Sequence, residues 1–458
     1  MRRRLFLSAL AASSLPAQNT AATTRHRAPR ALNPAARTSD WPNFLGPSHN
    51  GFSPETRLAK SFPASGPPLV WERAKGTGYS SPSLANGKLV FLHRMGNREI
   101  VECLHPETGD LLWSFDYPTQ FEDRYGYNNG PRSSAVIANG LVHTLSAESL
   151  LHTLHLDSGK LAWKLDLRAS FGVKQDFFGV ATTPLLESGN LIVQIGAPGG
   201  PTLAAFDPAS GKPLWRAGND WGPSYASPIP ATVHGKRRVF LFAGGESQPP
   251  TGGLLMLDPA TGAIDATFPW RSRGYESVNA SCPVISDNQV FISASYRTGG
   301  AMLAITPDLK LKPLWTTPGF GLHFNTPIWH NGHLFGFDGR NEPDASLACL
   351  NAATGKVVWR HNPEWKESIN GREQLLSTYR GNLLHVDGRF LALGELGHLL
   401  WMDLAPSGYK ESSRAWLFAA RETWSPPVLS RGLLYIVQHT RDALHAKGPR
   451  LLCYDLRA

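Results

Sequence analysis

The sequence lacks the features by which an enzyme or a membrane protein is most often recognised. Its 458 residues include only four Cys, and no two of them have the Cys-x-x-Cys spacing of zinc and redox sites. No stretch approaches the roughly 18 consecutive apolar residues that a membrane-spanning helix needs. The chain has no G-x-S-x-G, H-E-x-x-H, P-loop or dinucleotide-binding motif. The sequence therefore indicates no standard catalytic chemistry and no membrane span.

Acidic residues are missing from the first 37 positions, and this explains the basic net charge of +9. Those positions contain seven Arg, whereas the rest of the chain carries 38 basic and 36 acidic side chains. A protein that binds nucleic acid usually spreads its basic excess over a folded surface. The charge distribution gives no reason to expect a nucleic-acid partner.

The N-terminal sequence "MRRRLFLSALAASSLPA" (residues 1–17) has the plan of a signal peptide: a basic start, a short apolar run and a small-residue end. Arg3 and Arg4 resemble the twin-arginine export motif, although Arg2 precedes them where Ser or Thr is usual, so the Sec route stays open. Residues 18–39 are small and polar without an apolar period, and we expect a disordered tether. The prediction is an exported protein, periplasmic or extracellular, without a lipid anchor because the first hundred residues contain no Cys.

Glycine, proline and tryptophan are abundant, with 44, 36 and 14 copies, and they recur in a repeat of about 50 residues. Examples are "LHTLHLDSGKLAWKLD" (151–166) and "PTLAAFDPASGKPLWRAG" (201–218), each with a strand, an Asp-x-x-(Thr/Ser)-Gly turn and a second strand containing Trp. Four short strands in each unit of this length predict the blades of a β-propeller. The tryptophans of the seven units are Trp113, Trp163, Trp215, Trp270, Trp315, Trp359 and Trp416.

The two ends of the chain together supply one more unit. The C-terminal "PRLLCYDLRA" has a third strand but no Trp strand after it, and the missing strand is found at 67–74 as "PPLVWERA", with Trp71. We therefore predict an all-β fold over residues 67–458: an eight-bladed propeller of four-stranded antiparallel blades, with the N- and C-terminal strands sharing one blade. This arrangement removes an exposed sheet edge. All eight tryptophans are predicted to be structural.

The Ala-x-Asp-x-x-Thr-Gly-x-x-x-Trp repeat resembles that of the PQQ-like (quinoprotein-like) β-propellers. The segment "DWPNFLGPSHNGFSPET" (40–56) resembles the entry segment of a secreted bacterial branch of that family, and we assign residues 40–66 to an N-terminal entry segment. The resemblance covers residues 40–458 and implies the propeller fold. It leaves the activity open, because the same repeat occurs in enzymes and in non-enzymes.

Functional residues are expected in the connections from each Trp strand to the first strand of the next blade, which gather on one face of a propeller. These connections are long and rich in aromatic residues, as a small-ligand pocket would require. A packed lid over the channel is the alternative interpretation. The candidates are Tyr127, Asn129, Arg132, Asp176, Trp221, Tyr225, Arg273, Glu276, His323 and Trp424.

Two functions follow from the resemblance. The first, which we favour, is a non-catalytic scaffold: it would bind an unknown protein, peptide or glycan through its aromatic loops, as a monomer, with no cofactor, no metal and no catalytic residue. It resembles the assembly-factor component of the outer-membrane barrel machinery.

The second function is a PQQ- and Ca²⁺-dependent quinoprotein dehydrogenase of alcohols or sugars, for which Glu276, Asn279 and Asn129 are the candidate Ca²⁺ ligands. Several such enzymes have two adjacent Cys, and this chain has none.

Overall fold

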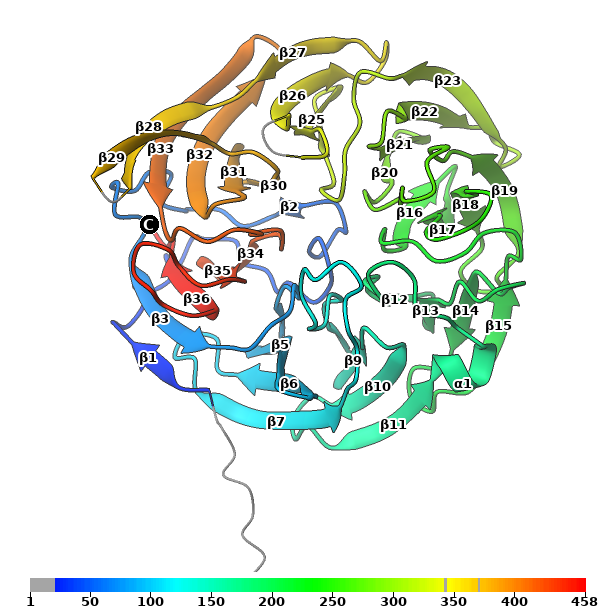
Figure 1. Ribbon diagram of the computed structural model, residues 1–458, viewed down its shortest axis with the longest axis horizontal. Helices are drawn as coiled ribbons and strands as arrows, with labels where there is room; N and C mark the ends of the chain where they lie inside the picture. Colours follow the sequence, from blue (N-terminus) through cyan, green and yellow to red (C-terminus); the bar gives the residue numbers. More distant parts are fainter. Residues whose placement is uncertain (1–20, 342–343, 370) are drawn as a thin grey trace, which may run out of the picture.

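The computed structural model describes residues 21–341, 344–369 and 371–458, and it shows eight sheets arranged as a ring (Figure 1). Each of the eight sheets contains a four-stranded antiparallel blade, and two of the sheets carry a fifth, N-terminal strand at one edge. In seven blades the neighbouring strands are consecutive in the chain. The predicted all-β, eight-bladed propeller is confirmed. The predicted signal peptide, residues 1–17, lies outside the described residues.

The first four blades follow one another along the chain without interruption of this order. Their strands are β4 (Ser83–Ala85), β5 (Lys88–Met95), β6 (Arg98–Leu104) and β7 (Leu111–Pro118) in blade 1; β8 (Val136–Ala138), β9 (Leu141–Leu145), β10 (Leu150–His155) and β11 (Leu161–Asp166) in blade 2; β12 (Leu185–Glu187), β13 (Asn190–Gln194), β14 (Leu203–Phe206) and β15 (Pro213–Ala217) in blade 3; and β16 (Ile229–Val233), β17 (Lys236–Ala243), β18 (Gly253–Leu257) and β19 (Ile264–Pro269) in blade 4.

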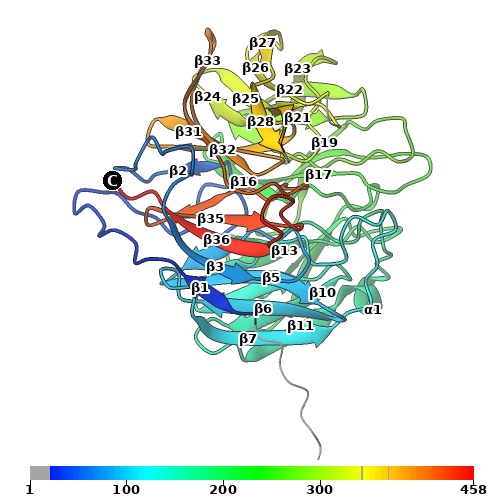
Figure 2. The same cartoon turned by 60° about the vertical axis from the view of Figure 1, so that its left-hand side comes forward.

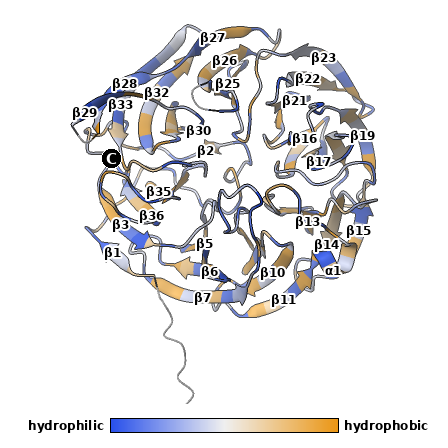
Figure 3. Cartoon of the chain, viewed as in Figure 1, coloured by the Kyte–Doolittle hydropathy of each residue, from blue (hydrophilic) through white to orange (hydrophobic). Residues whose placement is uncertain are grey.

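The next three blades have the same plan. Their strands are β20 (Val284–Ser286), β21 (Gln289–Ala294), β22 (Gly299–Ile305) and β23 (Leu311–Thr317) in blade 5; β24 (Ile328–His330), β25 (His333–Asp338), β26 (Ser346–Asn351) and β27 (Val357–His361) in blade 6; and β30 (Gly381–Val386), β31 (Arg389–Gly394), β32 (His398–Ala405) and β33 (Gly408–Trp416) in blade 7. The outermost strands alternate between hydrophobic and hydrophilic residues, as β7 and β11 show in Figure 3, because one side of each strand packs against a neighbouring blade.

Blade 8 closes the ring as predicted. Strands β34 (Val428–Ser430), β35 (Leu433–Gln438) and β36 (Arg450–Asp455) come from the C-terminus, and β3 (Leu69–Ala74) pairs with β36 as the outermost of the four. Figures 1 and 2 both show β3 beside β36, near the C-terminus of the chain.

The described part of the predicted tether is ordered on this blade, so the prediction is wrong for residues 21–39. Strand β1 (Thr23–Arg25) pairs antiparallel with the outer edge of β3. The Thr23 hydroxyl donates a hydrogen bond to the Gly109 carbonyl of blade 1 at 2.7 Å, and the Arg30 amide donates to Asp455 at 2.8 Å. The composition of the segment suggested disorder, but the unpaired edge of β3 supplies the hydrogen-bond partners that the segment cannot provide for itself.

The entry segment crosses the side of the ring that carries the turns between first and second strands. Trp41 pairs with Leu84 of blade 1, and β2 (Phe52–Ser53) runs parallel to β30 of blade 7. Glu55 accepts a hydrogen bond from the Gly432 amide of blade 8 at 2.8 Å. Because the blades are antiparallel, the connections between blades lie on the opposite side, which we call the loop face.

Six of the eight repeat tryptophans explain why the turn and the Trp recur together. Each donates its indole N–H to a carbonyl in the turn of the following blade; the pairs are Trp71–Pro106, Trp113–Leu156, Trp163–Pro208, Trp215–Pro259, Trp315–Ala352 and Trp359–Ala405, at 2.7–3.2 Å. The turn glycine lies directly on the ring: a Cβ at Gly109, which has φ +70°, would come within 2.7 Å of Trp71. Glycine is needed there both for the left-handed backbone and for the close approach.

Trp270 and Trp416 do not occupy this position, in contrast to the prediction. In blade 4 the position belongs to Ala266, which faces Met256, and Trp270 follows the end of β19 and stacks on Phe268. In blade 7 it belongs to Ser413, which faces Trp401. The alignment on the nearest aromatic residue was therefore shifted by three or four residues in these two units.

Two elements between blades were not predicted. A hairpin of β28 (Glu364–Ile369) and β29 (Arg372–Ser377) precedes blade 7, and its buried Trp365 donates a hydrogen bond to His398 at 3.0 Å. Helix α1 (Leu167–Phe171) follows blade 2, with Asp166 as its N-cap and Gly172 at its C-terminus. Within the described ranges, no helix has the length and apolar character to cross a membrane.

Candidate functional site: an aromatic cluster on the loop face

The loop face carries a continuous cluster of aromatic side chains from separate interblade loops. Trp424 is at its centre, with ring centroids 5.2 Å from Tyr79, 5.7 Å from Tyr127 and 5.3 Å from Phe324. Tyr127 in turn contacts Phe178 at 6.0 Å, and Phe178 contacts Tyr225 at 5.4 Å. The cluster thus joins loops that precede blades 1, 2, 3, 4, 6 and 8.

A buried ion pair holds Trp424 in place. Its indole N–H donates to Glu395 Oε1 at 2.8 Å, and Glu395 also accepts a hydrogen bond from Arg380 Nε at 2.9 Å. The Arg380 guanidinium lies 5.0 Å from the Trp424 ring centroid, within cation–π range. The ring is therefore fixed by a charged network rather than free to turn toward a ligand.

A second ion pair, between Arg132 and Asp123, lies under the neighbouring rings. The Arg132 guanidinium is 5.6 Å from the Tyr79 ring and 5.0 Å from the Phe121 ring, and burial lowers the pKa of Arg132. The Tyr79 hydroxyl donates to Glu422. These polar groups satisfy one another, which favours the packed-lid interpretation over an open pocket at the centre of the face.

The structure brings together about half of the predicted site residues. Tyr127, Tyr225 and Trp424 share the cluster, and His323 reaches it through Phe324, with ring centroids 5.4 Å apart. Burial lowers the pKa of His323 to about 3. Arg132 underlies the cluster as described above.

The other predicted residues lie elsewhere. Trp221 packs against the hydrophobic cluster of blades 3 and 4, and its carbonyl accepts a hydrogen bond from Thr202. Arg273 and Glu276 are exposed. Asn129 is also exposed, and its side-chain oxygen accepts a hydrogen bond from the Asp123 amide at 2.9 Å.

Sequence reasoning missed several members of the cluster. Tyr79 lies in the glycine-rich "GTGYSS" stretch before blade 1, and Phe178 and Phe324 directly follow aromatic or histidine residues in loops that were considered. The available signal was the density of aromatic residues in those loops. Arg380 could not be found in this way, because it follows the unpredicted hairpin β28–β29.

Three tyrosines form an exposed surface at the edge of the cluster, which we call the tyrosine patch: Tyr125, Tyr275 and Tyr127, the last of which also belongs to the cluster. Tyr125, Tyr127 and Tyr275 are 46%, 52% and 45% exposed, respectively. Tyr125 and Tyr275 contact Phe177 at 6.0 and 5.4 Å. The Tyr275 hydroxyl donates to Glu246 at 2.6 Å, and Glu246 pairs with Arg124. The patch therefore combines accessible aromatic rings with a fixed ion pair.

Asp176 connects two of the loops beneath this patch. Its Oδ1 accepts hydrogen bonds from the amides of Phe177 at 2.8 Å and Glu246 at 2.7 Å. Burial raises the pKa of Asp176 from 3.8 to about 6. Asp176 therefore links the two loops, and its negative charge lowers the stability of the folded protein.

Asp176→Asn should change the pH dependence of stability. Between pH 3.8 and 6 the unfolded chain loses this proton before the folded chain does, so the charge lowers wild-type stability as the pH rises through that window. Relative to wild type, the variant should gain up to about 3 kcal/mol between pH 4 and pH 7. Urea unfolding at a series of pH values measures this. Asp220→Asn, at an exposed carboxyl in the loop before blade 4, is the control, and a wild-type-to-variant difference that stays constant with pH contradicts the prediction.

A Ser–His pair lies under the cluster but cannot reach a substrate. Ser425 Oγ is 2.8 Å from His439 Nε2, and His439 Nδ1 is 2.7 Å from the Gly78 carbonyl. Both side chains are buried, and the ring of Tyr79 covers His439 at 5.0 Å. Burial holds the pKa of His439 well below its usual value. The pair joins the loops before blades 1 and 8 rather than presenting a nucleophile.

The candidate Ca²⁺ ligands do not form a cation site. Asn279 is buried, and its amide nitrogen donates to the Ala243 and Trp270 carbonyls at 2.8 and 3.0 Å. Glu276 and Asn129 are exposed on two different loops, whereas a Ca²⁺ site needs six or more converging oxygens. Among the residues that the structure describes, no group of three or more His, Cys, Asp or Glu could hold a metal ion, and the four Cys are separate and buried. These residues do not fit PQQ with Ca²⁺.

Comparisons with known proteins agree with the fold. A family model described as "Outer membrane protein assembly factor BamB" matches residues 97–361, which is more than half of the chain. Among solved structures, BamB from Moraxella catarrhalis has a TM-score of 0.55 and 14% identity, over 84% of this chain and 99% of that one. A europium-containing methanol dehydrogenase has a TM-score of 0.62 and 12% identity, over 91% and 98% of the two chains.

The quinohemoprotein alcohol dehydrogenase from Comamonas testosteroni is a further structural match, with a TM-score of 0.62 and 12% identity over 93% of this chain and 81% of that one. No curated protein sequence matches the chain. At these identities the structural matches establish the fold alone, and they include both an assembly factor and oxidoreductases.

Proposed function

Since this chain belongs to the PQQ-repeat propeller family of the outer membrane protein assembly factor BamB, we propose that it is a non-catalytic scaffold whose loop face binds a segment of a partner protein. The tyrosine patch is the observation that carries this proposal. Exposed Tyr beside Arg is the composition typical of protein-binding hot spots. The alternative, a PQQ-dependent dehydrogenase, lacks support from the candidate ligands described above.

Hydrogen bonds between the loops hold the tyrosine patch in place, so a partner can bind to it without a large rearrangement. Phe177 and Phe178, on which the tyrosines rest, are held by the Asp176 and Tyr225 hydrogen bonds. A rigid platform loses little conformational freedom when a partner binds. The Arg124–Glu246 pair beside it offers both a donor and an acceptor to a peptide backbone.

Photo-cross-linking in the organism that carries the gene tests the proposed contact. A photoreactive phenylalanine in place of Tyr127 should cross-link one discrete protein, because this ring is about half exposed in the patch. The same replacement at Leu112, which is exposed on the outer strand of blade 1, is the matched control and should not. The cross-link at position 127 should weaken at least about tenfold when Tyr125 and Tyr275 are both changed to Ala, given losses of about 1.4 kcal/mol or more at hot spots.

Two outcomes contradict the proposal. Equal cross-linking from positions 112 and 127, or a cross-link unaffected by the Tyr125 and Tyr275 changes, shows that the patch is not the contact. Saturable calorimetric binding of PQQ with Ca²⁺ to the purified protein, lost in Glu276→Ala, favours the dehydrogenase instead.

Deletion of the gene should lower the amount of assembled outer-membrane proteins if the partner belongs to their assembly.

The scaffold is proposed to act outside the cytoplasm after removal of the leader. This rests on the order of basic, apolar and small residues in positions 1–17. Replacing Arg3 and Arg4 together by Lys should abolish export through the twin-arginine route, measured as full-length precursor retained in the cytoplasmic fraction. Normal export of this variant assigns the protein to the Sec route, and a wild-type protein that keeps its leader in the cytoplasm contradicts the proposed location.

A further inference from the structure

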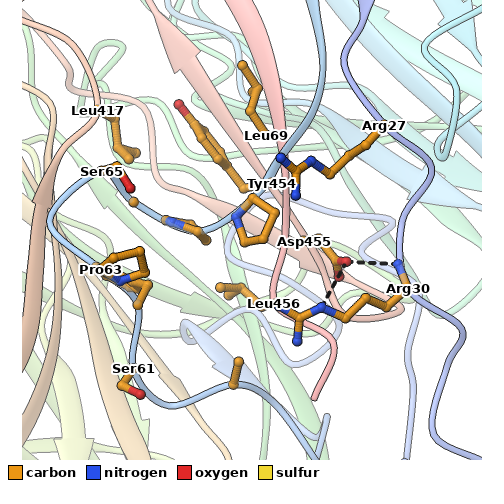
Figure 4. Close-up of a pocket in the computed structure, with 15 residues that line it drawn as sticks. Arg27, Arg30, Ser61, Pro63, Ser65, Leu69, Leu417, Tyr454, Asp455 and Leu456 are labelled. Carbon is orange, nitrogen blue, oxygen red and sulfur yellow. Dashed lines mark hydrogen bonds and ion pairs between the residues drawn. The ribbon is translucent and has the colours of Figure 1, made fainter.

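A cavity of about 550 Å³ lies where the two ends of the chain close the ring, in blade 8 and beside blade 7 (Figure 4). Four separate segments form its walls: the N-terminal arm (residues 21–39) at Arg27 and Arg30, residues 59–69 from the entry segment to the start of β3, Leu417 after β33, and residues 454–456 at and just after the end of β36. Its volume is in the range of small-molecule sites. None of the predicted loop-face residues lines it.

The apolar wall of this cavity is built mainly from aromatic and proline side chains. Phe62, Leu69 and Leu417 pack against the hydrophobic cluster of blades 7 and 8, and Pro67 and Pro68 continue the surface. Tyr454 adds its ring to the wall, and among the described residues its hydroxyl has no hydrogen-bond partner. The wall is therefore apolar on the side that faces blades 7 and 8.

The cavity also has one uncompensated positive charge. Arg30 is neutralised by Asp455, since its amide donates to Asp455 Oδ2 at 2.8 Å and its Nε lies 3.8 Å from the same oxygen. The Arg27 guanidinium has neither a hydrogen bond nor an ion pair with any described residue, and Figure 4 shows it directed toward Leu69 and Tyr454. Its side chain is exposed, so a ligand can reach it from solvent.

We propose that this cavity binds a small amphiphilic carboxylate, with the carboxylate on Arg27 and the apolar or aromatic body against Phe62, Leu417 and Tyr454. A guanidinium binds a carboxylate in a bidentate geometry. Free carboxylic acids and the C-terminal residue of a peptide share this chemistry. Because the ligand touches all four segments that close the ring, its binding stabilises the closed propeller.

Calorimetry and thermal unfolding with 3-phenylpropanoate test the proposal, with 3-phenylpropanamide as the uncharged probe of the same shape. The carboxylate should bind saturably and raise Tm, and the amide should bind at least tenfold more weakly. Arg27→Gln should remove this preference, and Arg27→Lys should keep part of it. Arg25→Gln is the matched control, because Arg25 belongs to the same arm but pairs with Asp110.

Each outcome of this experiment is informative. Absence of saturable binding, equal binding of the two probes, or unchanged carboxylate binding by Arg27→Gln overturns the proposal. If the site is confirmed, a phenylalanine-terminated tripeptide with a free or an amidated C-terminus distinguishes the two sources: tighter binding of the free tripeptide than of 3-phenylpropanoate identifies a peptide C-terminus. The loop face plays no part in either result.

Discussion

Replacing Trp71 by Ala should lower the free energy of unfolding by about 3–5 kcal/mol, the range for loss of a fully buried Trp or Phe. Trp71 has no exposed surface, and its indole N–H donates to the Pro106 carbonyl of blade 1 at 2.8 Å. Its ring covers Gly109 on one side and lies 6.0 Å from Tyr435. The substitution opens a cavity between blades 8 and 1, where ring closure depends on non-covalent contacts alone. Denaturant unfolding followed by Trp fluorescence and circular dichroism measures the loss.

Trp270→Ala is the matched control for Trp71→Ala. Trp270 is half-buried and lies outside the interblade position, and its indole N–H makes only a long, 3.4 Å hydrogen bond to the Gly299 carbonyl. We expect it to cost less than half as much as Trp71→Ala. Similar losses for the two variants contradict the structural distinction between the repeat tryptophans.

Arg73→Met should be similarly destabilising, by about 3–5 kcal/mol, because it leaves a buried carboxylate without its partner. Arg73 in β3 donates from Nε and Nη2 to the two oxygens of Glu102 in β6, both at 2.7 Å, and only 3% and 5% of the two side chains is exposed. Arg73 also donates to Thr23 of β1 at 2.8 Å. The pair therefore connects the N-terminal arm, the closing strand and blade 1.

A second substitution separates the buried charge from the lost packing. Arg73→Met combined with Glu102→Leu should recover at least half of the loss, because the uncompensated carboxylate is gone. Arg237→Met, which breaks the more exposed pair with Glu187, should cost no more than about 1 kcal/mol. If the double variant is no more stable than Arg73→Met alone, the charge is not the cause.

The sequence predicts the propeller well because each repeat contains the residues that form its own turn and its contact with the next blade. The Asp-x-x-Thr-Gly turn fixes a hairpin, and the Trp and the turn glycine form a contact that repeats from blade to blade. Prediction fails where a unit lacks one of these parts: Trp270 and Trp416 are the nearest aromatic residues in their units, but Ala266 and Ser413 occupy the equivalent positions. Only the strand pairing, which joins residues across a sheet, distinguishes the interblade position from the nearest aromatic residue in the sequence.

The candidate site is less predictable because its residues lie in loops, which do not follow the repeat. That aromatic residues gather on the loop face follows from the repeat, but which of them meet depends on loop paths that have no regular hydrogen-bond pattern. Trp221 packs against the hydrophobic cluster of blades 3 and 4, whereas Tyr79, which is not among the predicted site residues, contacts Trp424. Arg380 enters through a hairpin that interrupts the repeat.

The sequence by itself determined the number of blades, the ring closure by 67–74 and the separation of the basic N-terminus from a nearly neutral body, because periodicity and composition are local properties. The tertiary structure alone decided that residues 21–39 lie on blade 8, that Tyr125, Tyr127 and Tyr275 form one surface, and that Arg27, which has no ion-pair partner among the described residues, lines a cavity. Each of these depends on contacts between segments far apart in the chain, whose partners are set by packing and by unpaired strand edges rather than by nearby sequence.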